Sequence, residues 1–315
     1  MLKLIGYRLV LAVPQLMIVS LLVFSLIYLI PGSAAAVILG DAAASPEEIA
    51  RIEAELGLDQ PFLVRLFAWY GAALHGDLGT SILSGQPVTD MITQRLPATL
   101  SLVIGGLVVA VIVGISLGMY AGIKAGRPRD RAVTGFTAFM QSIPEFWLGQ
   151  ILVVVFVIQL HVAPVLAWVP PSQNVGRWLA GLLLPAIALG VGAAALISRQ
   201  MRTAMAESLN SRFVDTLTAA GVPRQRIIWG YAFKNSLVPA LAAVGLAIGV
   251  LFGTSLVMER VFSFPGLGTL MLSSVLGKDF PVVQGIALVI GVIVIIVNMV
   301  LDISYGVINP KARPA

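Results

Sequence analysis

The chain has no cysteine among its 315 residues and only two histidines, His75 and His161, which lie far apart in the sequence. The lack of cysteine excludes disulfides, thiolate metal sites and a cysteine nucleophile. Metal ligands occur in clusters, so two isolated histidines do not indicate a metal centre. We therefore expect this chain itself to bind no metal and no other cofactor.

Charged residues are also scarce. They make up 11% of the sequence, whereas soluble domains carry about 25%. Hydrophobic residues reach 58%, and the mean hydropathy is +0.96. This is the composition of an integral membrane protein. The net charge of +5 comes from basic residues in short loops, which favours a signal of membrane topology over a nucleic-acid-binding surface.

The familiar catalytic motifs are missing. Gly277 and Lys278 are followed by Asp279, and no glycine lies five residues before Gly277, so there is no phosphate-binding loop. The pattern Gly-x-Ser-x-Gly occurs once, at 114–118, but inside a long apolar stretch rather than at the strand-to-helix turn that a nucleophile elbow needs, and there is no HExxH pair. We expect no catalysis in this chain, and any ATP that drives it must be hydrolysed by another subunit.

The long uncharged stretches predict an all-α integral membrane protein with six transmembrane helices. The expected spans are 10–30, the stretch between 95 and 124, the stretch from about 131 to 160, and the segments 179–198, 237–258 and 282–301. In addition, Gly266 and Gly268 interrupt an outer excursion too apolar for a free loop, so a short re-entrant or interfacial helix is expected at 267–276. Fourteen Lys and Arg fall on one side of this topology and six on the other, which predicts that both termini are cytoplasmic.

These spans divide the chain into an N-terminal end with the first span (1–31), an extracytoplasmic insert (32–97) and a five-helix core (98–315). The insert is acidic, as expected on the outer side. Ser45 followed by Glu48 has the spacing of a capping box, and residues 62–74 form a second amphipathic stretch. The sequence therefore predicts a helical insert between the first and second spans.

The longest polar interruption of the second half is the loop 199–234, which carries six basic residues and two acidic ones and should be cytoplasmic. Asn210 or Ser211 can cap a short helix that follows. Phe213 and Leu217 share one face of that helix, which gives it a small apolar edge that could be offered to a partner. Gly221 suits the left-handed residue that ends it, and the next helix can start at residue 223, a proline.

This loop carries a family resemblance. FVDTLTAAGVPRQRIIWGYAFKNSLVPALAAVG resembles the cytoplasmic coupling segment of permease subunits of ATP-binding-cassette importers, most closely the dipeptide, oligopeptide and nickel branch. Three other stretches are similar to the same branch: PQLMIVSLLVFSLIYLIPG, GDLGTSILSGQPVTDMITQRLPATLSL and PGLGTLMLSSVLGKDFPVVQGI. The chain departs from it at Thr218 and Ala220, where relatives usually carry basic residues, and at Ser33, where an acidic residue is usual.

The resemblance implies the fold of a type I importer permease in the bacterial plasma (inner) membrane. It implies a second, similar permease, two ATPase subunits that hold ATP and Mg, an extracytoplasmic solute-binding protein and a peptide cargo. The residues that would contact the ATPase are Ser211, Arg212, Phe213, Val214, Asp215, Thr216, Leu217, Ala219, Ala220 and Gly221. Those that would dock the binding protein and form an outer gate are Phe264, Pro265, Gly266, Leu267 and Gly268.

Glu145 is an acidic residue expected near the middle of the third span, where an isolated charge costs at least about 2.5 kcal/mol. It can line the translocation pathway and meet a substrate ammonium. Alternatively it can have a structural role, as a pair with a neighbouring helix or as a protonated carboxyl near the subunit seam. Ser142 and Asn298 are weaker pathway candidates. Two alternatives to a peptide importer remain: an importer for nickel or another small solute, and an ion-gradient-driven transporter with Glu145 as proton relay. Ion-gradient-driven transporters usually contain internal sequence repeats, and the two halves of this sequence do not look alike.

Overall fold

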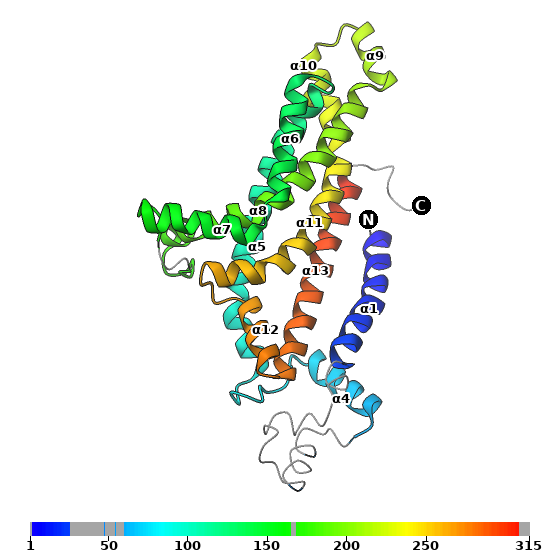
Figure 1. The fold of residues 1–315 in the computed structure, drawn as a ribbon. Coiled ribbons are helices and arrows are strands. Elements are labelled where there is room, and N and C mark those ends of the chain that lie inside the picture. Colours follow the sequence, from blue (N-terminus) through cyan, green and yellow to red (C-terminus); the bar gives the residue numbers. More distant parts are fainter. Residues whose placement is uncertain (1, 26–46, 48–53, 55–59, 165–167, 309–315) are drawn as a thin grey trace. The chain divides into compact units, whose positions relative to one another are not determined.

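The computed structural model describes residues 2–25, 47, 54, 60–164 and 168–308 (Figure 1). This part of the chain consists of helices and turns, with one isolated β-bridge between Thr80 and Pro87. The helices are α1 (Leu2–Ser25), α4 (Phe62–Leu74), α5 (Val88–Ile123), α6 (Pro128–Ser142), α7 (Glu145–Leu152), η2 (Val153–Gln159), α8 (Val175–Leu209), α9 (Arg212–Ala219), α10 (Arg224–Arg226), η3 (Ile227–Ala232), α11 (Phe233–Val261), α12 (Leu267–Leu276) and α13 (Phe280–Ile308).

Four stretches of helix in the described residues are long and apolar enough to cross a membrane: α5, α8, the run Arg224–Val261 that ends with α11, and Phe280–Leu301 within α13. The bent pair formed by α6 and α7–η2 makes a fifth if it counts as one span. The predicted first span, 10–30, ends outside the described residues, and its described apolar part, Val10–Ser25, is too short to cross alone. Four to five of the six predicted spans are therefore found.

Several local predictions are confirmed. The amphipathic stretch 62–74 is α4, and the short helix 267–276 is α12 with the expected bounds. The predicted helix that starts near residue 45 falls largely outside the described residues. The core spans are longer than the apolar windows, since α8 and α11 continue through polar residues at their ends.

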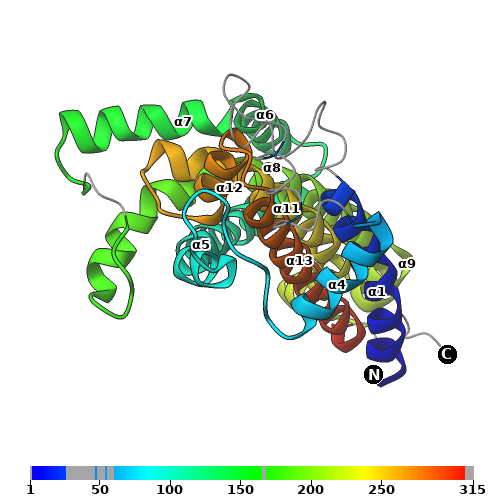
Figure 2. The same cartoon turned by 90° about the horizontal axis from the view of Figure 1, so that it is seen from below.

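The predicted third span, from about 131 to 160, is not straight in the structure. α6 ends at Ser142, and α7 leaves it at an angle of 89°. Ile143 has φ −83° and ψ 122°, the extended conformation that a following proline imposes on its predecessor, and Pro144 then starts α7. Figure 2 shows α6 almost end-on while α7 lies along its length.

The chain forms two compact units: Met1–Gly6, Pro97–Gly268 and Ile296–Ala315 make up unit 1, and Tyr7–Leu96 with Thr269–Ile295 make up unit 2. Within unit 2, the buried Asp279 accepts hydrogen bonds from the Ser81 hydroxyl (2.5 Å) and from the Ile82 amide (3.1 Å). Phe24 packs edge-on against Phe62, with ring centroids 5.5 Å apart. Unit 2 thus joins segments from both ends of the chain.

Unit 1 is built on α8, which packs against α5 on one side and runs beside α11 (Figure 1). The contact with α5 is close because glycines face α8. A Cβ on Gly118 would overlap the carbonyl of Ser198, and one on Gly122 would lie 2.8 Å from the carbonyl oxygen of Arg202. On α8, a Cβ on Gly190 would lie 2.6 Å from the carbonyl oxygen of Gly106. Small residues allow this approach where lipid gives no hydrophobic driving force between helices.

Gly118→Ala should therefore separate α5 from α8 and destabilise the protein by about 2 kcal/mol, as overpacking does. The measurement is the temperature at which the detergent-solubilised chain loses its monodisperse peak. Gly135→Ala is the matched control, since a Cβ there meets nothing within 4 Å. Equal midpoints for the two variants would contradict the close packing.

Candidate functional site

The predicted coupling helix is α9, Arg212–Ala219, with Ser211 at its N-cap position. The Ser211 hydroxyl does not cap it but donates to the Ser208 carbonyl (2.5 Å). None of the residues of α9 is buried. Gly221 has φ +75°, so the predicted left-handed residue is confirmed, and Pro223 occupies the N-cap of α10. The sequence thus located both ends of this helix correctly.

The two sides of α9 have different surroundings. Val214 and Thr218, one turn apart, face a cavity of about 410 Å³ between α9, the end of α8 and the α5–α6 turn. The cavity wall also includes Arg127 and Arg224. Asp215 and Thr216 are exposed, while Phe213 and Leu217 are half-buried. One face of α9 is therefore turned toward its own chain, and the other is accessible.

A compact methionine-rich cluster supports the segment that carries α9. Met119 of α5, Met201 and Met205 of α8, and Ile228 and Ala232 of η3 are buried together. The buried Ser236 hydroxyl donates to the Ala232 carbonyl (2.7 Å). Three helices thus meet at this end of unit 1, and the loop on both sides of α9 is tied to their packing (Figure 1).

An ion pair joins α6 to α8 in the same region. Arg202 donates to both carboxylate oxygens of Asp130, at 2.6 and 2.7 Å, and the side chain of Asp130 is only 3% exposed. The Gly126 amide donates to Asp130 as well (2.8 Å). The fork of an arginine on a carboxylate fixes direction as well as distance. The bond therefore sets α6 and the α5–α6 turn relative to α8.

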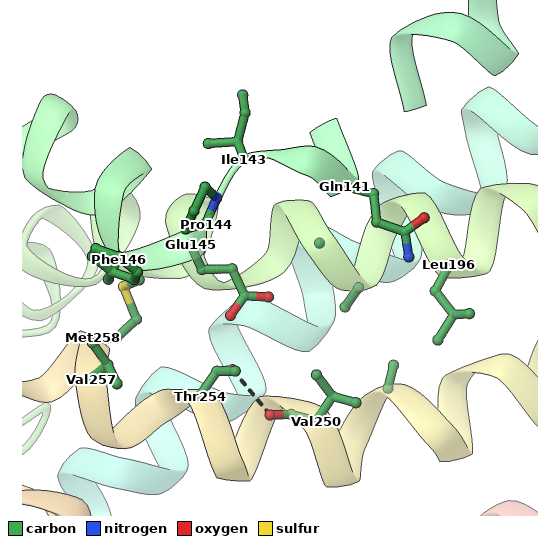
Figure 3. Close-up of a pocket in the computed structure, with 13 residues that line it drawn as sticks. Gln141, Ile143, Pro144, Glu145, Phe146, Leu196, Val250, Thr254, Val257 and Met258 are labelled. Carbon is green, nitrogen blue, oxygen red and sulfur yellow. Dashed lines mark hydrogen bonds between the residues drawn. The ribbon is translucent and has the colours of Figure 1, made fainter. Parts of the chain in front are cut away.

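Glu145 lines a separate cavity of about 420 Å³ within unit 1. Its walls come from α6, α7, α8 and α11, and Figure 3 shows the Glu145 carboxylate pointing toward Thr254 of α11. Gly192 of α8 makes room for this carboxylate, because a Cβ there would lie 2.5 Å from its Oε1. No Lys or Arg pairs with Glu145 among the described residues. The cavity thus holds a half-buried acidic group over largely apolar walls.

The other pathway candidates lie elsewhere. The Ser142 hydroxyl donates to the Phe139 carbonyl (2.8 Å), and Ser142 lines a different depression with Pro144. Asn298 of α13 lies near Gly245 of α11 and does not line the Glu145 cavity. Of the three residues, only Glu145 reaches this cavity.

Sequence reasoning missed the residues that share the cavity with Glu145. Gln141 lies four residues before it, on α6, and accepts a hydrogen bond from Arg199 (2.9 Å), while Thr254 and Gly192 come from distant spans. Polar side chains in otherwise apolar spans are the signal that could have selected Gln141 and Thr254. Their convergence depends on the break at Pro144, and the sequence did not predict how large the bend there is.

The predicted docking segment is ordered within unit 1. Phe264 is 2% exposed, and its ring centroid lies 5.6 Å from that of Trp168. Leu267 is fully buried, while Pro265 is exposed. The five docking candidates thus form a folded turn with only part of its surface accessible.

Comparison with known proteins decides the family. Residues 114–314 match the model of the binding-protein-dependent transport system inner membrane component, and residues 1–103 match the N-terminal model of such membrane components. The chain belongs to this permease family. Members of the family are transport permeases rather than catalytic enzymes.

The chain is 37% identical over 313 residues to a Brucella abortus (strain 2308) protein whose name assigns it to a peptide transport system as a permease, with 99% of each chain covered. It is 33% identical over 336 residues to the dipeptide transport system permease protein DppB of Escherichia coli (strain K12), again with 99% of each covered. The resemblance to peptide permeases of ATP-binding-cassette transporters is confirmed.

Arg202→Gln should leave the Asp130 carboxylate buried without its cation and destabilise the chain by about 2 kcal/mol. Asp130→Asn with Arg202→Gln should cost less than the sum of the two single changes, because the double variant leaves no unpaired charge. Thermal unfolding of the four proteins in detergent measures this, with the exposed Arg212→Gln as control. Strict additivity would show that the pair carries no coupling energy.

Proposed function

We propose that this chain is one permease half of an ATP-driven peptide importer. It would form the translocation pathway with a second, similar permease, above two ATPase subunits and below an extracytoplasmic solute-binding protein. The observation that carries the proposal is α9, a short amphipathic helix with no buried residue held at one end of unit 1. Membership of the permease family and full-length similarity to peptide permeases support it.

The accessible side of α9 would sit in a groove of an ATPase subunit. The other side faces the cavity formed with α8 and the α5–α6 turn, while Leu209 and Ile228, before and after α9, belong to the methionine-rich cluster, so a push on α9 would be passed to packed helices at its two ends. Closure of the ATPases on ATP would then shift the helices of unit 1 as a body rather than bend the loop. Each step requires contacts that differ between the inward-open and outward-open states.

The cavity at Glu145 would be part of the pathway. Its carboxylate has no described cation partner, and the walls are mainly apolar, so it suits the ammonium group and apolar side chains of a short peptide. This supports the pathway reading of Glu145 over a structural ion pair. A nickel cargo gains no such support, because no group of three or more His, Cys, Asp or Glu is found in the described residues.

The decisive experiment is uptake into proteoliposomes that contain the full transporter and its binding protein, with a peptide length series and a nickel chelate as cargo. Uptake of peptides that needs ATP and survives collapse of the proton gradient is expected. Uptake that follows the proton gradient without ATP would make the chain an ion-driven transporter. Uptake of the nickel chelate but not of peptides would change the proposed cargo and leave the proposed ATP-driven mechanism in place.

Gly221→Leu should lower peptide uptake several-fold, while Gly221→Asn should keep most of it. A Cβ at position 221 meets nothing within 4 Å, so the side chain has room, and only the left-handed backbone (φ +75°) penalises leucine. Asparagine tolerates that conformation better than leucine does. Uptake and ATP hydrolysis are measured together in proteoliposomes. Equal uptake by both variants would remove the turn after α9 from the coupling route.

Glu145→Gln should reduce uptake of peptides with a free amino terminus several-fold without lowering the amount of protein in the membrane. The amide keeps the size of the side chain but loses the charge that attracts an ammonium group. Uptake and immunoblotting are the measurements, and the exposed Glu207→Gln on α8 is the control. Loss of the protein itself would assign Glu145 a structural role instead.

A further inference from the structure

Glu259 is a fully buried carboxyl group near the end of α11. Such a group is costly to bury unless it is hydrogen-bonded. Thr99 of α5 supplies one bond: its hydroxyl donates to Glu259 Oε1 at 2.6 Å. Thr99 is itself 1% exposed, so water does not compete for this bond. The bond joins α5 to α11 through two residues that are 160 positions apart in the sequence.

The same hydroxyl makes a second bond. Thr99 Oγ1 accepts from the amide of Leu267 at 2.7 Å, the first residue of α12. A threonine hydroxyl has one proton to donate and two lone pairs to accept with, so both bonds form at once. The first amides of a helix have no partner inside it, and here one is satisfied by a side chain from α5. Thr99 therefore bridges α5, α11 and the start of α12.

The turn 262–268 is shaped to fit against Glu259. A Cβ on Gly266 would overlap the carboxyl group of Glu259, and one on Gly268 would lie 2.9 Å from its Oε2. The Phe264 amide donates to the Glu259 carbonyl at 2.8 Å. Glycines at these two places thus let the backbone of the turn approach the buried carboxyl group closely.

We propose that Thr99 and Glu259 are positioning residues that fix the turn 262–268 to α5 and α11, so that any movement of these helices is passed to the turn. The inference rests on the proposed function in one respect: the turn is then part of the surface that meets the binding protein. The hydroxyl of Thr99 is the shared atom, and its removal breaks both bonds while leaving the shape of the side chain.

The direct test is hydrogen–deuterium exchange of the complete transporter in nanodiscs. Thr99→Val is nearly isosteric with threonine but has no hydroxyl, so peptides that cover 262–268 should exchange about tenfold faster or more. Thr99→Ser keeps the hydroxyl and should exchange like the wild type. Thr93→Val, on the exposed side of the same helix, removes a hydroxyl that donates to the Asp90 carbonyl and should leave 262–268 unchanged.

The second readout is binding-protein-stimulated ATP hydrolysis. Thr99→Val should raise the concentration of binding protein needed for half-maximal stimulation about tenfold, with little change in the maximal rate, because the turn is loosened while the ATPase contact is untouched. Thr99→Ser should restore the wild-type concentration. A general folding defect would instead lower the maximal rate in proportion to the protein lost.

Equal exchange rates of residues 262–268 in Thr99→Val and Thr99→Ser would overturn the bridge, regardless of which cargo the transporter carries. So does rapid exchange of this turn in the wild type, a result that needs no variant. Faster exchange in Thr99→Val with an unchanged need for binding protein supports the bridge but overturns its role in docking. If the wild type hydrolyses no ATP while the exchange difference persists, the proposed importer function fails and the bridge stands.

Discussion

The close contact between α5 and α8 is the constraint on which unit 1 depends. In a membrane, an apolar side chain gains little by contacting another helix instead of lipid, so two helices stay together when their backbones can approach closely. Gly114, Gly118 and Gly122 lie on one face of α5 at every fourth residue, and each would collide with α8 if it carried a Cβ. α8 in turn is the most buried of the membrane-crossing helices. The cavity at Glu145 and the cluster below α9 are both built from its side chains.

This central position of α8 links the two functional regions. Gly192 and Leu196 line the Glu145 cavity, and Met201 and Met205 contribute to the cluster beside α9, so a few turns of one helix connect them. Arg199 and Arg202, in the same stretch of α8, tie it to α6. Leu209 at the end of α8 packs against this cluster, so α8 links the segment just before α9 to the cavity at Glu145.

The sequence predicted the bounds of the helices better than the contacts between them. The bounds of α4, α9 and α12 followed from capping residues, glycines and apolar spacing, because these signals act within a few residues. The contacts between the glycines of α5 and α8 could not be predicted, because periodicity carries no information about which helices meet. Thr99 went unnoticed for the same reason: its role depends on Glu259 and Leu267 beside it, and the sequence does not show that these residues meet.

The break at Pro144 shows how one local rule shapes a site. A proline in an apolar span can also lie inside one helix, as Pro97 and Pro185 do in α5 and α8. At Pro144 the preceding residue takes the extended conformation, and the chain turns by 89°. That turn starts α7 at Glu145 and brings its carboxylate over Gly192, where a straight helix would have carried it onward. The acidic group and the space that accommodates it are therefore consequences of one residue order, Ile143–Pro144–Glu145, set against a glycine on the central helix.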